Sequence, residues 1–344
     1  MSNRRDFLRK SFIGAAAVAV PGVISNDAQA SDFVNRNVFK PLPVSCLSYS
    51  FNALVREGMM DIFHYFETCR YRYGIDAADL WNGMIRSYED DAYIGKIHRA
   101  LQERQLVVPG IACDGAHLIS APDRDNPEER TRLRGVQDRW IEIGKRLGAG
   151  FLRFDAGPMP GGYVTNTIRE EWKPEDFDYL VKRYKELAQK AYDNGFKIGA
   201  ENHQGHEKYW PNLEKLIKAV DHPGFGICVH FGDVGGWTPH SPETMRQDNE
   251  AFSRAAAKWI CHTHFGWDYI EDAAWLLKMM TILRDAGYKG YHSAECYAGQ
   301  NELILTGIMI DRMKAVLNSW NNGGTGEYFP VRQPRTQPQS PPQR

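Results

Sequence analysis

Residues 174–203 have the sequence PEDFDYLVKRYKELAQKAYDNGFKIGAENH, which predicts a helix followed directly by a buried strand. Pro174 is a favoured first-turn residue, and apolar side chains recur behind it at helical spacing. Asn194 and Gly195 form a typical helix stop. The run 197–203 is apolar at 198–200 and polar at its end. The stretch therefore predicts one helix–strand unit whose strand ends in functional side chains.

The same kind of short apolar run occurs eight times along the chain. The runs lie at 44–51, 74–81, 106–113, 151–156, 197–203, 226–231, 259–265 and 291–296. Helical patterns fill the gaps between them, and no sequence is left over for another domain. This alternation predicts an α/β protein with a single (β/α)8 TIM barrel. A doubly wound open sheet is the competing architecture, and the lack of a Gly-x-Gly-x-x-Gly motif after the first strand disfavours it.

The composition excludes several classes of protein. The chain has 344 residues, 42% of them apolar, which is enough for a large core and excludes a disordered chain or a disulfide-stapled miniprotein. With 42 basic against 43 acidic residues, the formal net charge is -1, so we expect no nucleic-acid partner. The composition leaves a homo-oligomer open.

The two ends of the chain are unlike the rest. Arg4 and Arg5 precede an uncharged apolar segment at 12–24, which is shorter than the roughly 20 residues of a membrane-spanning helix. A small-x-small cleavage site follows at 28–30. We therefore expect Tat-type export to the periplasm, with no stable membrane insertion after cleavage. The predicted parts are a Tat signal peptide at 1–30, the barrel at 31–320 and a flexible Pro/Gln-rich tail at 321–344.

Four consecutive strands carry candidate metal ligands near their carboxyl ends. These residues are Glu201, His230, His264 and Glu295. Successive members are 29, 34 and 31 residues apart, about one strand–helix unit each, which predicts that all four lie at one height in the barrel. One such residue is more often structural, but four in register favour a site for a divalent cation.

Five motifs follow one another along the barrel. They are LSYSF at 47–51, GIDAADLW at 74–81, ENH at 201–203, HTH at 262–264 and GYKG at 287–290, which leads into Glu295. In this order and spacing, the chain resembles the xylose isomerase-like barrel superfamily, in particular its sugar epimerase and isomerase branch. The resemblance covers roughly residues 44–318.

The resemblance implies a divalent metal held by Glu, Asp, His and Glu from strands five to eight. Glu201, His264 and Glu295 match three of these positions, whereas His230 occupies the position of the Asp. Either His230 is the third ligand or Asp233 reaches in from the following loop; we favour His230 because it keeps the strand phase. We expect one ion, with Mn or Zn favoured over Fe, Co or Mg.

The resemblance also implies the catalytic residues. Glu201 and Glu295 would remove and return the proton next to a sugar carbonyl, through an enediolate. Our candidates for substrate contacts are Trp81, Arg153, His203, Asp233 and His262. We expect the six cysteines to be mostly buried in strands. Cys228, Cys261 and Cys296, each near a predicted ligand, would pack around the site, and disulfides are left open.

These features predict a metal-dependent sugar isomerase or epimerase. Because we expect export, the substrate would be a non-phosphorylated sugar, a keto sugar or a glycoside. One alternative is a metal-dependent lyase or hydratase that acts on 3-keto-glycosides by β-elimination after the same proton abstraction. The other is a non-catalytic sugar-binding barrel, which the replacement of the family's Asp by His230 would favour.

Overall fold

The computed structural model describes residues 42–120, 125–157, 168–231, 243–266 and 272–327. The predicted signal peptide, Asp233 and residues 328–344 of the predicted tail lie outside the described residues. The strands are β1 Val44–Cys46, β2 Leu80–Trp81, β3 Ile111–Ala112, β4 Phe151–Arg153, β5 Lys197–Glu201, β6 Phe225–Phe231, β7 Ile260–Gly266 and β8 His292–Glu295. Each of them lies in, or overlaps, one of the eight predicted runs.

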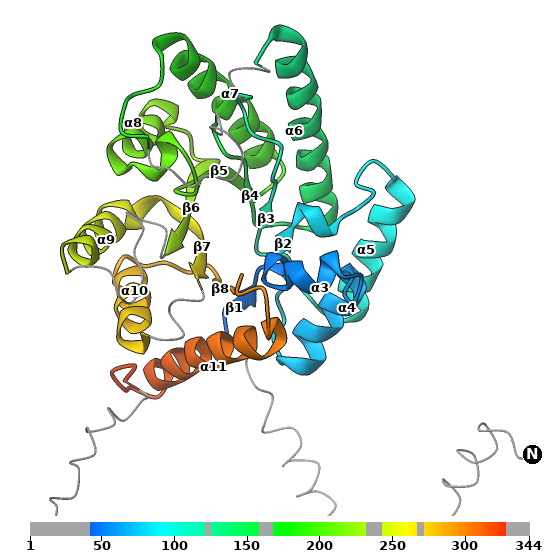
Figure 1. Cartoon of the computed structure of the whole chain (residues 1–344), viewed down its shortest axis with the longest axis vertical. Coiled ribbons are helices and arrows are strands. Elements are labelled where there is room, and N and C mark those ends of the chain that lie inside the picture. The colour runs from blue at the N-terminus through cyan, green and yellow to red at the C-terminus, as the bar shows by residue number, and fades with distance from the viewer. Residues whose placement is uncertain (1–41, 121–124, 158–167, 232–242, 267–271, 328–344) are drawn as a thin grey trace, which may run out of the picture. The chain divides into compact units, whose positions relative to one another are not determined.

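The strands form one parallel sheet that curls into a barrel (Figure 1). Their order is β1-β8-β7-β6-β5-β4-β3-β2. A single parallel bridge between Leu47 and Asp79 connects the first strand to the second and closes the ring. The predicted (β/α)8 TIM barrel is confirmed.

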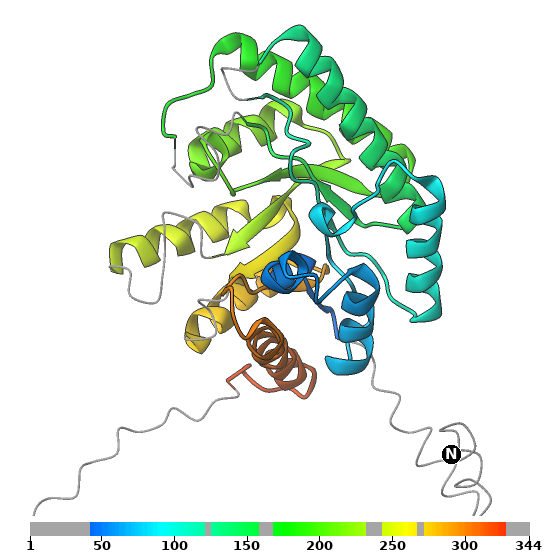
Figure 2. The same ribbon diagram turned by 45° about the vertical axis from the view of Figure 1, so that its right-hand side comes forward.

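Helices surround the sheet on its outer side (Figures 1 and 2). They are α3 Asn52–Arg56, α4 Ile62–Glu67, α5 Asp91–Glu103, α6 Pro127–Leu147, α7 Pro174–Asp193, α8 Trp210–Val220, α9 Glu243–Ala256, α10 Ala273–Asp285 and α11 Glu302–Asn321. Helix α7 begins at the predicted proline, and Gly195, two residues beyond its end, has a left-handed backbone with φ of 81°. None of the described helices is long and apolar enough to cross a membrane.

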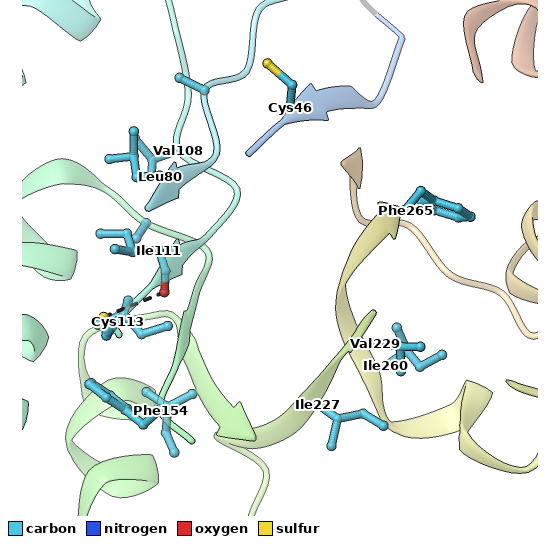
Figure 3. Packing of buried hydrophobic residues seen from close by; sticks show 14 of the residues in the cluster. Cys46, Leu80, Val108, Ile111, Cys113, Phe154, Ile227, Val229, Ile260 and Phe265 are labelled. Atoms are coloured by element: carbon cyan, nitrogen blue, oxygen red, sulfur yellow. Dashed lines mark hydrogen bonds between the residues drawn. The ribbon is translucent and has the colours of Figure 1, made fainter. Parts of the chain in front are cut away.

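The strands separate an apolar outer layer from a polar interior. Ile227 and Val229 point away from the barrel axis, and they belong to the apolar core of the protein (Figure 3). Because side chains alternate along a strand, Cys228 and His230 lie on the opposite face of β6, toward the axis. Barrel interiors are usually filled by branched apolar residues. The charged and imidazole groups found inside this barrel therefore indicate a function beyond packing.

Strand register explains how the four candidate ligands reach one place. Glu201 pairs with Cys228, two residues before His230, and His230 pairs with His264. His264 in turn pairs with the residue two positions before Glu295. The set therefore shifts by four residues of register over three strand pairs. In a barrel of this type, tilted strands shift by about one residue per strand at constant height, so this stagger brings the four residues close together.

His292, the first residue of β8, makes the stability of the fold sensitive to acid. Burial lowers the pKa of this imidazole from 6.5 to about 4, and its ring packs near Tyr288 and Phe265. In the unfolded chain His292 binds a proton below about pH 6.5, whereas in the folded protein it binds this proton only near pH 4. The free energy of unfolding therefore falls as the pH decreases through this window, by about 2 kcal/mol at pH 5.

Urea unfolding at pH 7 and pH 5 tests this prediction. We expect His292→Leu to lose about 2 kcal/mol less than the parent protein between the two pH values, because leucine has no proton to bind. Equal losses in the variant and the parent protein would contradict the assignment of the acid sensitivity to His292.

Candidate functional site

The four candidate ligands converge at the carboxyl ends of β5 to β8. His264 Nδ1 lies 2.8 Å from Glu201 Oε1 and 3.6 Å from Glu295 Oε2. His230 Nε2 lies 3.1 Å from the same oxygen of Glu295. All four residues are buried. The structure thus brings together the predicted set, whose role as metal ligands stays a prediction.

Asn202 holds the backbone of His230 in place. Its side-chain amide donates to the carbonyl of His230 at 3.0 Å, and its side-chain oxygen accepts from the backbone N–H of His230 at 2.8 Å. Sequence analysis placed Asn202 in a motif but gave it no role. Its position directly after Glu201 was the available signal for such a contact. Successive side chains of a strand point to opposite faces, so Asn202 contacts other residues than Glu201 does.

The charges of the site suit a cation. Burial opposes ionisation of Glu201, but His264 and Arg153 outweigh it and hold the pKa of this carboxyl well below its usual range. Burial also opposes protonation of His264, yet the carboxylates of Glu201 and Asp79 beside it raise its pKa well above the usual value. In the protein without metal, therefore, a proton on His264 balances the carboxylate of Glu201.

The donor set fits a divalent metal ion. Two carboxylates and two imidazoles within a few ångströms are common ligands of zinc, iron and manganese. One buried polar atom beside the set, Asp79 Oδ1, has no hydrogen-bond partner, whereas His264 Nε2 faces the other oxygen of Asp79 at 3.3 Å. Buried polar groups without partners are rare in structural cores and are frequent where an ion or a water belongs. The donor atoms of these residues are therefore suitable ligands for a divalent ion.

Arg153 of β4 lies among three carboxylates and beside an imidazole. Its guanidinium contacts Asp155 at 2.6 Å and Glu201 at 3.3 Å, and it also pairs with Asp114. His203 Nδ1 lies 3.1 Å from the same guanidinium. Only 4% of the arginine side chain is exposed. We predicted Arg153 as a substrate contact; its strongest contacts in the structure are to these acids.

Asp79 joins two histidines below the site. It lies next to β2 and is fully buried. One of its oxygens is 2.7 Å from His262 Nε2 and 3.3 Å from His264 Nε2, and accepts from the Ser293 hydroxyl at 2.6 Å. Sequence analysis gave Asp79 no role, although it lies two residues before the end of the second predicted strand. Its contacts support the ring of His264 from the side away from Glu201.

A small pocket of 60 Å³ opens at the candidate ligands. It is lined by Leu47, Tyr49, Trp81, Ala112, Asp114, Arg153, Glu201, His203, His264 and Glu295. Its aromatic wall is the indole of Trp81, which meets the Tyr49 ring edge-on and donates to Asp114 at 2.7 Å. This volume suits an ion with one or two waters.

The five predicted substrate contacts thus have different positions. Three of them, Trp81, Arg153 and His203, line the pocket. His262 is buried beside Asp79 and is not among the lining residues. Asp233 lies outside the described residues.

A larger hollow, of 610 Å³, lies at the opposite end of the barrel. Its lining includes Lys197, which begins β5, and Lys258 and Gly290, which lie two residues before β7 and β8. Barrel enzymes carry out their chemistry at the carboxyl ends of the strands, whereas residues at the other end contribute to the stability of the fold. The smaller pocket, where the titratable groups gather, is therefore the candidate active site.

The fold and the site define the class of this protein as a TIM barrel with a candidate metal centre at the carboxyl ends of its strands. The chain belongs to the xylose isomerase-like TIM barrel family, whose model matches residues 71–314. The family expected from the motifs is confirmed. No curated protein matches the sequence significantly.

Solved structures share the fold at low sequence identity. The probable 3-DHS dehydratase AsbF from Bacillus anthracis has a TM-score of 0.58 and 14% identity, covering 79% of this chain and 99% of that chain. D-psicose 3-epimerase from Clostridium cellulolyticum H10, solved with D-tagatose, has a TM-score of 0.58 and 13% identity, covering 79% and 98%. A xylose isomerase-like TIM barrel protein from Mycobacterium smegmatis, in complex with magnesium, has a TM-score of 0.54 and 13% identity, covering 78% and 97%.

Proposed function

We propose that this protein is a divalent-metal-dependent sugar isomerase or epimerase that moves a proton next to a carbonyl through an enediolate. The observation that carries the proposal is the placement of Glu201 and Glu295 next to the same nitrogen of His264, at 2.8 and 3.6 Å from its Nδ1. Two carboxylates around one imidazole provide both the ligands for an ion and a pair of groups that exchange protons.

Each residue of the site has a role in this proposal. Glu201, His230, His264 and Glu295 hold the ion. When bound, the ion supplies Lewis acidity toward a carbonyl and its neighbouring hydroxyl, which acidifies the C–H group between them. Glu201 is held ionised by its neighbours and accepts the proton, and Glu295 gives a proton to the other face of the same carbon. Trp81 offers its aromatic face to the sugar.

A second candidate function is elimination. If a leaving group is present β to the carbon that loses its proton, the same abstraction expels that group, as in a lyase or hydratase acting on a 3-keto-glycoside. One of the similar solved structures is a probable 3-DHS dehydratase, so this fold also occurs in a protein named for elimination.

We further propose that the protein acts in the periplasm on non-phosphorylated sugars, because of the twin arginines and the predicted cleavage site that precede the barrel.

Deuterated water distinguishes these functions. The metal-loaded protein is incubated with free ketoses and, separately, with 3-keto-glycosides, and the products are followed by proton NMR. Exchange of the proton next to the carbonyl with formation of an epimer supports the proposal. Release of the aglycone supports elimination instead. No exchange in either class of sugar would overturn both and leave a non-catalytic sugar-binding barrel.

A further inference from the structure

Cys228 lies directly beside two candidate ligands. It precedes His230 by two residues on β6 and therefore faces the barrel interior with it, and it pairs with Glu201 in the sheet register. Its Sγ lies 3.7 Å from Glu201 Oε1 and 3.6 Å from His264 Nδ1. The side chain is fully buried. The thiol therefore lies among the donor atoms of the predicted metal ligands, although the sequence did not predict Cys228 as one of them.

These distances match the spacing of donors around a zinc-sized ion. At the tetrahedral angle, bonds of about 2.3 Å to sulfur and about 2.0–2.2 Å to nitrogen or oxygen place the sulfur about 3.5–3.7 Å from the other donor. The sulfur–nitrogen and sulfur–oxygen distances of 3.6 and 3.7 Å agree with this spacing. The shorter contact of 2.8 Å between His264 Nδ1 and Glu201 Oε1 is a hydrogen bond in the protein without metal. All three donor atoms lie within 4.8 Å of one another.

We propose that Cys228 is a ligand of the metal ion, forming one face of its coordination shell together with Glu201 and His264. The inference rests on the metal site of the proposed function and not on the sugar chemistry. On binding, the S–H bond breaks, sulfur donates its electron pair to the ion, and the proton leaves to solvent. No oxidation or reduction takes place.

A thiolate ligand changes which ion the site prefers. Soft sulfur ligands favour zinc and similar transition metals, whereas magnesium and manganese prefer oxygen donors. The side chain is fully buried, and a bound ion would displace the proton of its thiol. The site would therefore select zinc, cobalt or iron over magnesium more strongly than carboxylates and imidazoles do alone.

Cobalt substitution tests the proposal by a readout that is independent of activity. We expect the full-length protein loaded with Co²⁺ to show an intense near-ultraviolet band from sulfur-to-cobalt charge transfer. Cys228→Ser should abolish the band, because a serine hydroxyl gives no such transition. Cys113→Ser is the matched control, since Cys113 is also fully buried but its Sγ contacts the carbonyl of Ile111 instead. The control should keep the band.

Metal affinity gives a second, quantitative measurement. We expect Cys228→Ser to bind Zn²⁺ at least about tenfold more weakly than the parent protein, with Mg²⁺ affinity changed by less than about threefold. A parent protein that binds cobalt without a charge-transfer band overturns the proposal, whether or not the variant folds. Since both measurements use the metal alone, a protein that shows the band but exchanges no sugar proton would contradict only the proposed function.

Discussion

We expect Glu201→Gln to reduce the rate of proton exchange on the sugar by at least about a thousandfold. A positioned general base contributes on the order of 10²–10⁴ in rate, and this residue also holds the ion. Glutamine has nearly the same shape but its amide accepts no proton at neutral pH. The neighbours that keep the carboxyl of Glu201 ionised, His264 and Arg153, remain in the variant. Because these two cations lose a buried partner and the ion loses a ligand, the metal content and the free energy of unfolding of the variant are measured beside the exchange rate.

Glu295→Gln allows the two steps of the reaction to be separated. In that variant Glu201 can still remove a proton and return it to the same face of the carbon. Two rates are compared in Glu295→Gln: epimer formation, and deuterium exchange in the epimer that Glu201 deprotonates. We expect the first rate to fall by at least about a hundredfold more than the second. Proton NMR in deuterated water measures both, at saturating metal and with the metal content of each variant determined.

Glu207→Gln is the matched control for both variants. Glu207 is buried on the same side of the barrel, where its carboxyl accepts from the backbone N–H of Ala156 at 2.7 Å. Burial raises the pKa of this carboxyl well above its usual value, so it is already neutral and an amide oxygen can replace it. We expect exchange within about twofold of the parent protein. If Glu201→Gln were no slower than this control, the assignment of Glu201 as the base would be wrong.

The fold could be predicted because its signals are local. A proline that starts α7 and a glycine that follows it act within a few residues, and the buried runs of β5 to β8 are continuous. The runs of β2 and β3 were predicted at eight residues, whereas only Leu80–Trp81 and Ile111–Ala112 form regular strand. The sequence around these two strands is apolar enough for burial, which is why longer strands were predicted. In the structure the pairing continues there only as isolated bridges, such as the one between Ala77 and Val107.

The site could be predicted only in part, because register and depth are properties of the whole barrel. Spacing along the chain indicates that His230 and His264 share one face with Glu201, but it does not give the stagger that places Cys228 opposite Glu201. The link between Asp79 and His262 joins residues 183 positions apart and depends on ring closure. The phase of Cys228, two residues from His230, was the one available signal for its position.

We expect Arg153→Leu to destabilise the protein by about 3–5 kcal/mol. The substitution leaves Asp155 and Glu201 buried without the cation that contacts them at 2.6 and 3.3 Å. Burial opposes the charge on Arg153, yet Asp155, Asp114 and Glu201 together raise its pKa well above the usual value, so the guanidinium is the positive centre of this cluster. Removing one partner of a buried ion pair has a far larger effect than removing both.

Two further variants test whether the loss comes from buried charge. Arg132→Leu is the control, because Arg132 pairs with Glu129 at 2.7 Å but is 59% exposed, so we expect a change below about 1 kcal/mol in urea unfolding. Adding Asp155→Asn to Arg153→Leu removes one of the unpaired carboxylates and should restore at least about 1 kcal/mol. If the double variant were less stable than Arg153→Leu, lost packing would explain the effect instead of unpaired charge. Arg153 would then act as a spacer between β4 and β5, and not as the counter-ion that keeps Glu201 ionised.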